Sequence, residues 1–117
     1  MRFLGVKDII NIWVAINDQG KVIKTTGLYR YLNDEKDAGW LFWFCVAPEE
    51  RGKGVGKQLL LFSIDEAKKS GAKYLRLYTS DAPDEKKAQM LYEKYGLMEK
   101  TRQKKLFWTK IVREMRF

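Results

Sequence analysis

The segment from Trp40 to Ala67 constrains the fold more than any other part of the chain. Residues 40–47 are apolar on both alternating faces, which is typical of a strand buried in the middle of a sheet. The apolar residues that follow the bend at residues 51–57 are Leu59, Leu60, Ile64 and Ala67. They share one face of a helix, so the segment predicts a strand, a glycine-rich loop and a helix that packs on the sheet.

The glycine-rich loop, RGKGVGK at residues 51–57, suits an anion. The first amides of a helix have no partner inside it, and the aligned peptide dipoles leave a partial positive charge there. Glycine lacks the Cβ atom that would hold a ligand away, and Arg51, Lys53 and Lys57 add positive charge. The alternative interpretation is that the glycines only turn the chain and let the helix approach the strand closely.

Two common phosphate-binding motifs do not fit this loop. A P-loop requires Ser or Thr after Gly-Lys, whereas Gln58 follows Gly56-Lys57. A Rossmann G-x-G-x-x-G motif that starts at Gly52 would place its third glycine at Lys57. The pattern that remains is R-x-x-G-x-G.

Two segments together resemble the GCN5-related N-acetyltransferase (GNAT) superfamily. Residues 46–60, VAPEERGKGVGKQLL, are similar to its acetyl-CoA loop. Residues 88–97, AQMLYEKYGL, are similar to its A-x-x-L-Y-x-x-x-G-F segment, with Leu97 in place of phenylalanine. The resemblance covers roughly residues 20–100 and implies an α+β fold with a mixed sheet in one domain, residues 1–117. Its parts would be an antiparallel meander, a central parallel strand pair with a crossover helix, a second helix and a C-terminal hairpin.

Apolar patterns and turn signals place the other elements. Strands are expected at residues 9–16, 21–32, 40–47, 74–79, 97–102 and 106–113, the last two joined around residues 103–105. Helices are expected over residues 56–70 and from a start signal at residues 80–84 to Gly96. We expect Asp81 to be an N-cap, Gly71 and Gly96 to end the helices, and Gly27 to mark a bulge or a close backbone approach.

The resemblance implies transfer of the acetyl group of acetyl-CoA to an amine, without a metal. A bulge in the central strand at residues 44–46 would admit the pantetheine arm, and the amides of residues 51–57 would bind the diphosphate. The residues assigned to acetyl-CoA are Phe44, Cys45, Val46, Arg51, Gly52, Lys53, Gly54, Val55, Gly56 and Lys57.

Tyr92 matches the family tyrosine that protonates the departing thiolate. A phenol has a pKa of about 10 and a thiol one of about 8.5, so a tyrosine is still protonated at neutral pH when the thiolate forms. The alternative interpretation is that Tyr92 is a core aromatic residue at helical spacing.

Several residues depart from the family pattern. Glu85 stands where many members have an asparagine, and residues 39–47 contain no carboxylate that could act as a general base. Asp37, Glu35 and Glu49 are the remaining candidates, and ordered water is another route for the proton. Cys45 has no histidine to activate it and lies in an apolar strand, so we expect it to be buried rather than to act as a nucleophile.

Composition excludes several classes of function. The chain has no histidine and one cysteine, which excludes Ser-His-Asp and Cys-His triads, histidine-based zinc sites and an internal disulfide. The single cysteine favours a reducing cytoplasm, and no apolar run approaches a membrane span, so no membrane partner is expected. The net charge of +8 is spread along the chain among acids, without a nucleic-acid-binding motif.

The acceptor is the least defined partner. The family typically begins with a strand and two helices that form one wall of the acceptor groove, whereas about eight residues precede Ile9 here. The groove is therefore expected to be open, or completed by a homodimer or another partner. Three interpretations follow: an acetyltransferase for a peptide, polyamine or small amine; a non-catalytic acyl-CoA-binding or interaction module; and, last, a nucleic-acid-associated protein.

Overall fold

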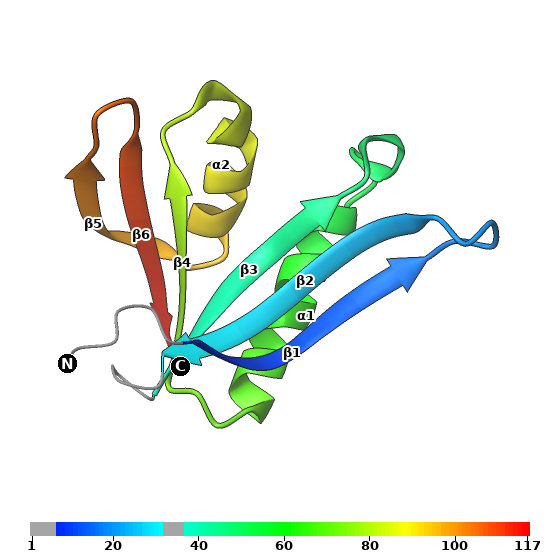
Figure 1. Cartoon of the computed structure of the whole chain (residues 1–117), viewed down its shortest axis with the longest axis horizontal. Helices are drawn as coiled ribbons and strands as arrows, with labels where there is room; N and C mark the ends of the chain where they lie inside the picture. Colours follow the sequence, from blue (N-terminus) through cyan, green and yellow to red (C-terminus); the bar gives the residue numbers. More distant parts are fainter. Residues whose placement is uncertain (1–6, 32–36) are drawn as a thin grey trace.

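Six strands form one mixed sheet in the order β1-β2-β3-β4-β6-β5 (Figure 1). The computed structural model describes residues 7–31 and 37–117. The strands are β1 (Lys7–Ile16), β2 (Val22–Tyr31), β3 (Ala38–Val46), β4 (Tyr74–Ser80), β5 (Met98–Lys104) and β6 (Thr109–Arg116). The helices are α1 (Val55–Lys69) and α2 (Lys86–Lys94), preceded by the 3-10 turns η1 (Pro48–Glu50) and η2 (Pro83–Glu85).

The sheet opens between β3 and β4, its parallel pair. These strands are paired only at Ala38–Tyr74, Gly39–Leu75 and Trp40–Arg76. Beyond Trp40 they diverge, and Figure 1 shows the resulting V between them. The neighbouring pairs β1–β2, β2–β3, β4–β6 and β5–β6 are antiparallel. The predicted meander, parallel pair and C-terminal hairpin are therefore confirmed.

Both helices contribute to one hydrophobic core. Leu60, Ile64 and Ala67 of α1 are buried in the same cluster as Tyr92 of α2. The strand residues in that cluster are Leu28, Leu41, Leu75 and Leu77. The helices end as predicted, since Gly71 follows α1 with φ 88° and Gly96 follows α2 with φ 96°, a conformation that favours glycine.

Two predictions about the ends of elements were wrong. The β5–β6 turn spans residues 105–108 rather than 103–105, so the strand expected from residue 106 begins at Thr109. The apolar residues from 106 onward predicted a strand, but Leu106 and Phe107 are 88% and 92% exposed and lie in the turn. Asp81 is not an N-cap: its Oδ1 accepts a hydrogen bond from the Thr109 amide at 3.1 Å, and Ala82 precedes η2. Residue 32, expected to end the second strand, lies outside the described residues.

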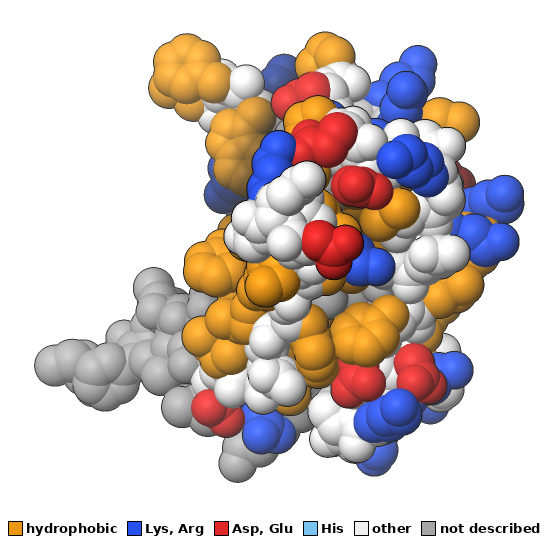
Figure 2. Space-filling model, turned by 90° about the vertical axis from the view of Figure 1, so that its right-hand side faces the viewer, with side chains coloured by type: hydrophobic (Ala, Val, Ile, Leu, Met, Phe, Trp, Pro, Cys, Tyr) orange, Lys and Arg blue, Asp and Glu red, His pale blue; other side chains and the backbone are white. Residues whose placement is uncertain are grey.

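Within the described part of the chain, neither helix combines the length and apolar character needed to cross a membrane. On the face shown in Figure 2, Lys and Arg side chains are interspersed with Asp and Glu. The cations visible there do not form a single patch that would favour nucleic-acid binding.

Candidate functional site

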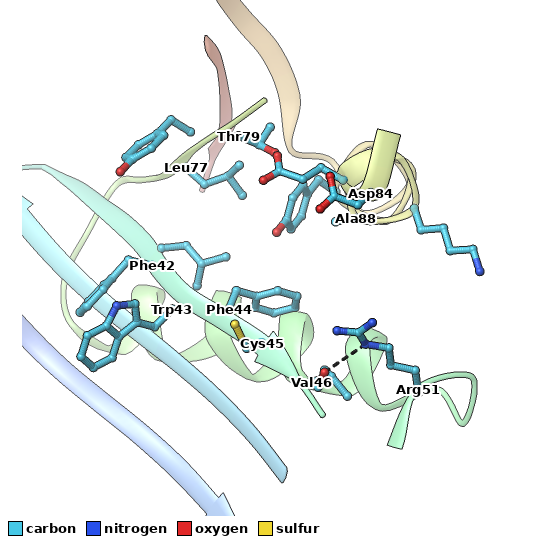
Figure 3. Close-up of a pocket in the computed structure, with 15 residues that line it drawn as sticks. Phe42, Trp43, Phe44, Cys45, Val46, Arg51, Leu77, Thr79, Asp84 and Ala88 are labelled. Carbon is cyan, nitrogen blue, oxygen red and sulfur yellow. Dashed lines mark hydrogen bonds between the residues drawn. The ribbon is translucent and has the colours of Figure 1, made fainter. Parts of the chain in front are cut away.

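A cavity of about 430 Å³ lies in the V between β3 and β4 (Figure 3). Residues of β3 and β4 line it, together with Arg51 and residues of η2 and α2. Five of the predicted site residues, Phe44, Cys45, Val46, Arg51 and Tyr92, are among the lining residues. The other six, residues 52–57, do not line the cavity but form the loop and first helical turn that follow Arg51.

The bulge in β3 lies at Trp43 and Phe44, whereas it was predicted at residues 44–46. Cys45 pairs with Thr25 and Phe42 pairs with Gly27, so Trp43 and Phe44 lie opposite a single residue of β2. Trp43 has φ 51°, which is uncommon for a residue other than glycine. The Thr25 hydroxyl donates a hydrogen bond to the Trp43 carbonyl at 2.6 Å and so holds this conformation.

Gly27 explains why the register shifts at this point. A Cβ atom at residue 27 would lie 2.6 Å from Cε1 of Phe42, far inside van der Waals contact. The Phe42 ring therefore packs directly over the β2 backbone. The prediction that Gly27 marks a bulge or a close approach is confirmed in both respects.

Cys45 is exposed, so the expectation that it is buried was wrong. The prediction assumed that the central strand has neighbours along its whole length. Because β4 diverges beyond Trp40, the second half of β3 borders the cavity instead. Trp43 is 64% exposed for the same reason.

The N-terminus of α1 has the geometry of an anion site. Its N-cap is Gly54, with φ 78° and no side-chain cap, and Gly52 has φ 82°. The Gln58 amide is the first to bond to the helix, reaching the Gly54 carbonyl at 3.1 Å. Among the described residues, the amides of residues 52–57 donate to no protein group, which leaves them free for a ligand.

Arg51 differs from the rest of the loop. Its amide donates to the Pro48 carbonyl at 3.3 Å. This amide is therefore not free to bind a ligand, contrary to the prediction. Its Nε donates to the Val46 carbonyl at 3.1 Å, the dashed line in Figure 3. This bond ties the glycine-rich loop to the end of β3. Lys53 is exposed and lies 3.7 Å from Glu50, and Lys57 lies 6.0 Å from the Tyr95 ring centroid.

Tyr92 is a buried phenol on the wall of the cavity. Its ring packs edge-on against Phe44, with centroids 5.9 Å apart, and its exposed fraction is 7%. Burial, followed by the charges of Glu85 and Cys45, raises the pKa of Tyr92 to about 12. The phenol therefore keeps its proton at neutral pH, as a proton donor to a thiolate must.

Glu85 lies near Tyr92 and has a defined structural role. Its Oε2 accepts hydrogen bonds from the Ser80 amide at 2.7 Å, from the Ser80 hydroxyl at 3.1 Å and from the Thr79 hydroxyl. Burial alone would raise the pKa of Glu85, but these hydrogen bonds lower it. Glu85 is therefore an ionised carboxylate that holds η2 against the end of β4.

The candidate bases from the sequence do not meet the cavity. Glu49 forms an ion pair with Lys21, and Asp37 lies 3.8 Å from the Lys73 ammonium. Neither lines the cavity, and Glu35 lies outside the described residues. The acids that do line it, Asp84 and Glu85, were not predicted as bases, because the family pattern places the base on or near the central strand. The available signal for these two acids was their position four and three residues before Ala88, the first residue of the second GNAT-like segment.

Comparisons with known proteins agree with this geometry. A family model described as "Acetyltransferase (GNAT) domain" matches residues 8–97. No curated protein matches the chain. Solved structures match at high structural similarity but low sequence identity.

Three solved structures illustrate the match. A GNAT-family protein from Desulfovibrio desulfuricans has a TM-score of 0.79 at 20% identity, over 90% of this chain and 67% of its own. A GNAT family acetyltransferase from Elizabethkingia anophelis, with acetyl-CoA bound, has a TM-score of 0.77 at 21% identity, over 91% and 75%. A ribosomal-protein-alanine N-acetyltransferase from Brucella melitensis has a TM-score of 0.76 at 19% identity, over 91% and 68%. At these identities the likeness shows a common fold.

Proposed function

Because the chain belongs to the GNAT acetyltransferase family, we propose that it transfers the acetyl group of acetyl-CoA to a primary amine in a ternary complex. The observation that carries the proposal is the unpartnered row of amides at residues 52–57 beside the opening between β3 and β4. A solved structure of the same fold contains acetyl-CoA, which supports the same ligand here.

The residues present fit acetyl-CoA. The free amides, the positive end of the α1 dipole and the side chains of Lys53 and Lys57 suit a diphosphate. The cavity continues from Arg51 along the exposed part of β3, where a pantetheine arm can run. When bound, acetyl-CoA supplies an activated acetyl thioester.

Tyr92 supplies the proton that the reaction needs. As the amine nitrogen forms a bond to the acetyl carbon, the carbon–sulfur bond breaks and the sulfur takes the phenolic proton. The raised pKa keeps Tyr92 protonated until the thiolate develops. The proton of the attacking amine leaves to water, and the Tyr92 phenolate takes a proton back from water. Glu85, whose charge acts on Tyr92, is already held by Thr79 and Ser80.

A second candidate function is a non-catalytic acyl-CoA-binding module. It is favoured by the positions of Asp37 and Glu49, which lie away from the cavity and leave β3 without a base. In that case Tyr92 would be a packing residue against Phe44. The two candidates share the binding loop and differ in turnover.

One pair of measurements separates them. Acetyl-CoA at about a hundred times its dissociation constant should add about 2.7 kcal/mol to the free energy of unfolding. Thiol release is then followed with a panel of amines. Stabilisation with release supports the acetyltransferase, and stabilisation without release on any amine supports the module. No stabilisation contradicts both.

A further inference from the structure

We propose that the acceptor is a primary amine with a single cationic group and an apolar, ring-bearing body, and that this body lies on Phe42, Trp43 and Tyr78. The inference rests on the proposed function and names its substrate class. The three rings line the cavity from the two diverging strands, Phe42 and Trp43 from β3 and Tyr78 from β4.

The bulge in β3 builds this aromatic surface. Consecutive residues of a regular strand point to opposite faces, which would separate Phe42 from Trp43. Here the positive φ of Trp43 brings the two rings together, with centroids 5.5 Å apart and planes inclined at 48°. Figure 3 shows both rings at the same end of the cavity.

Neighbouring residues hold the two rings in place. Phe42 rests over Gly27, where any larger residue would displace the ring. The Trp43 carbonyl is held by the Thr25 hydroxyl. A strained backbone that is fixed in this way commonly marks a ligand site, because the surrounding structure has to maintain it.

The surface is open to a ligand. Trp43 is 64% exposed and Tyr78 is 49% exposed, although both line the cavity. Large aromatic faces that remain exposed inside a concavity suit a flat apolar ligand, which would cover them. Figure 3 shows Arg51 at the opposite end of the cavity, where the glycine-rich loop follows it in the chain. Acetyl-CoA would therefore occupy the Arg51 end, and the acceptor the aromatic end.

The charges around the aromatic end disfavour a polyamine. The Lys110 ammonium lies 5.0 Å from the centroid of the Tyr78 ring, so a second cation on the acceptor would meet a like charge. Among the described residues, the acids that line the cavity are Asp84 and Glu85, which lie in η2, just before α2. Figure 3 shows Asp84 across the cavity from Phe42 and Trp43, so this carboxylate lies away from the rings on which the body of the acceptor would lie.

The test compares three amines. With the whole chain and saturating acetyl-CoA, we expect kcat/KM for 2-phenylethylamine to exceed that for ethylamine and for spermidine by about 10-fold or more. Trp43→Ala should remove this preference through KM, and Trp43→Phe should restore most of it. Leu61→Ala, an exposed change on α1, is the matched control and should leave the ratio unchanged.

A second variant and a binding measurement complete the test. Trp43→Gly removes the indole at a positive φ that glycine tolerates, and it replaces Trp43→Ala if that variant does not fold. In the complex with coenzyme A, 2-phenylethylamine should raise the melting temperature of the wild type but not of Trp43→Gly. This measurement needs no turnover, so it distinguishes an amine that does not bind the aromatic surface from an enzyme that binds the amine but does not acetylate it. Equal or better use of spermidine, or an unchanged ratio in Trp43→Ala, overturns the inference.

Discussion

The two ends of the cavity are built from different parts of the polypeptide. At the Arg51 end the cavity borders the glycine-rich loop, where the ligand groups are backbone, with two glycines at positive φ and a row of free amides. The aromatic end is made of the side chains of Phe42, Trp43 and Tyr78 on strands that diverge. A site made of backbone groups binds one constant chemical group, whereas the specificity of a site made of side chains changes with single substitutions. A backbone site therefore suits a co-substrate that all family members share, and a side-chain site suits a particular acceptor.

Tyr92 lies on the wall of this cavity and belongs to neither end. Its replacement should have the largest effect of the substitutions considered, a loss of kcat. Tyr92→Phe should lower kcat at least about 100-fold, because general acid catalysis typically contributes that much or more. Phenylalanine keeps the packing against Phe44, so acetyl-CoA binding and the preference among amines should not change. Initial rates of thiol release and acetyl-CoA titrations measure the two quantities separately.

Tyr95→Phe is the control for this substitution. Tyr95 is on the same helical segment but does not line the cavity, so its rate should stay near that of the wild type. Normal turnover in Tyr92→Phe would show that Tyr92 only packs against Phe44. Weaker acetyl-CoA binding in the same variant would instead place Tyr92 within the binding site.

The Arg51 end could be predicted from sequence because its determinants are local. Gly52, Gly54 and Gly56 set the turn within a few residues, and the fold follows from the same segment and the residues that resemble the second GNAT motif. The helix ends at Gly71 and Gly96 were predicted for the same reason. Each of these features depends on the backbone freedom of single residues.

The aromatic end could not be predicted because it depends on contacts between distant segments. The position of the bulge depends on Gly27, which lies 15 residues before Phe42. The exposure of Cys45 depends on where β4 leaves β3. Asp81 was wrongly expected to cap a helix because its partner, the Thr109 amide, lies 28 residues away. Sequence spacing does not show such pairings.

Alkaline pH tests how deeply Tyr92 is buried between the two ends. Its pKa is about 12 in the folded protein, above the ordinary value of about 10, so the folded state retains a proton that the unfolded state loses. The stability from this group is present below pH 10 and is lost as the pH rises toward 12. At pH 11 the loss should be about 1.4 kcal/mol.

Urea unfolding at pH 8 and pH 11 measures this loss. Tyr92→Phe should lose less stability between the two values than the wild type, by the same amount. The comparison between the two proteins is needed because burial also raises the pKa of Tyr29, which contributes to both. An equal loss in the two proteins would mean that solvent reaches the Tyr92 phenol, and that Tyr92 is less buried than its exposed fraction of 7% indicates.

A pair of glycine substitutions tests whether the loop at the Arg51 end binds through its backbone. Gly54 and Gly20 have almost the same φ, 78° and 77°, and a Cβ atom at either position would meet no atom within 4 Å. Gly54→Ala and Gly20→Ala should therefore each lower the free energy of unfolding by about 1–2 kcal/mol, through backbone strain alone. Only Gly54→Ala should also weaken acetyl-CoA binding, because Gly54 orients the free amides and Gly20 lies in the β1–β2 turn. Urea unfolding and calorimetric titration give the two values. If both variants bind acetyl-CoA as the wild type does, the amides do not hold the diphosphate, and the contrast between a backbone end and a side-chain end is lost.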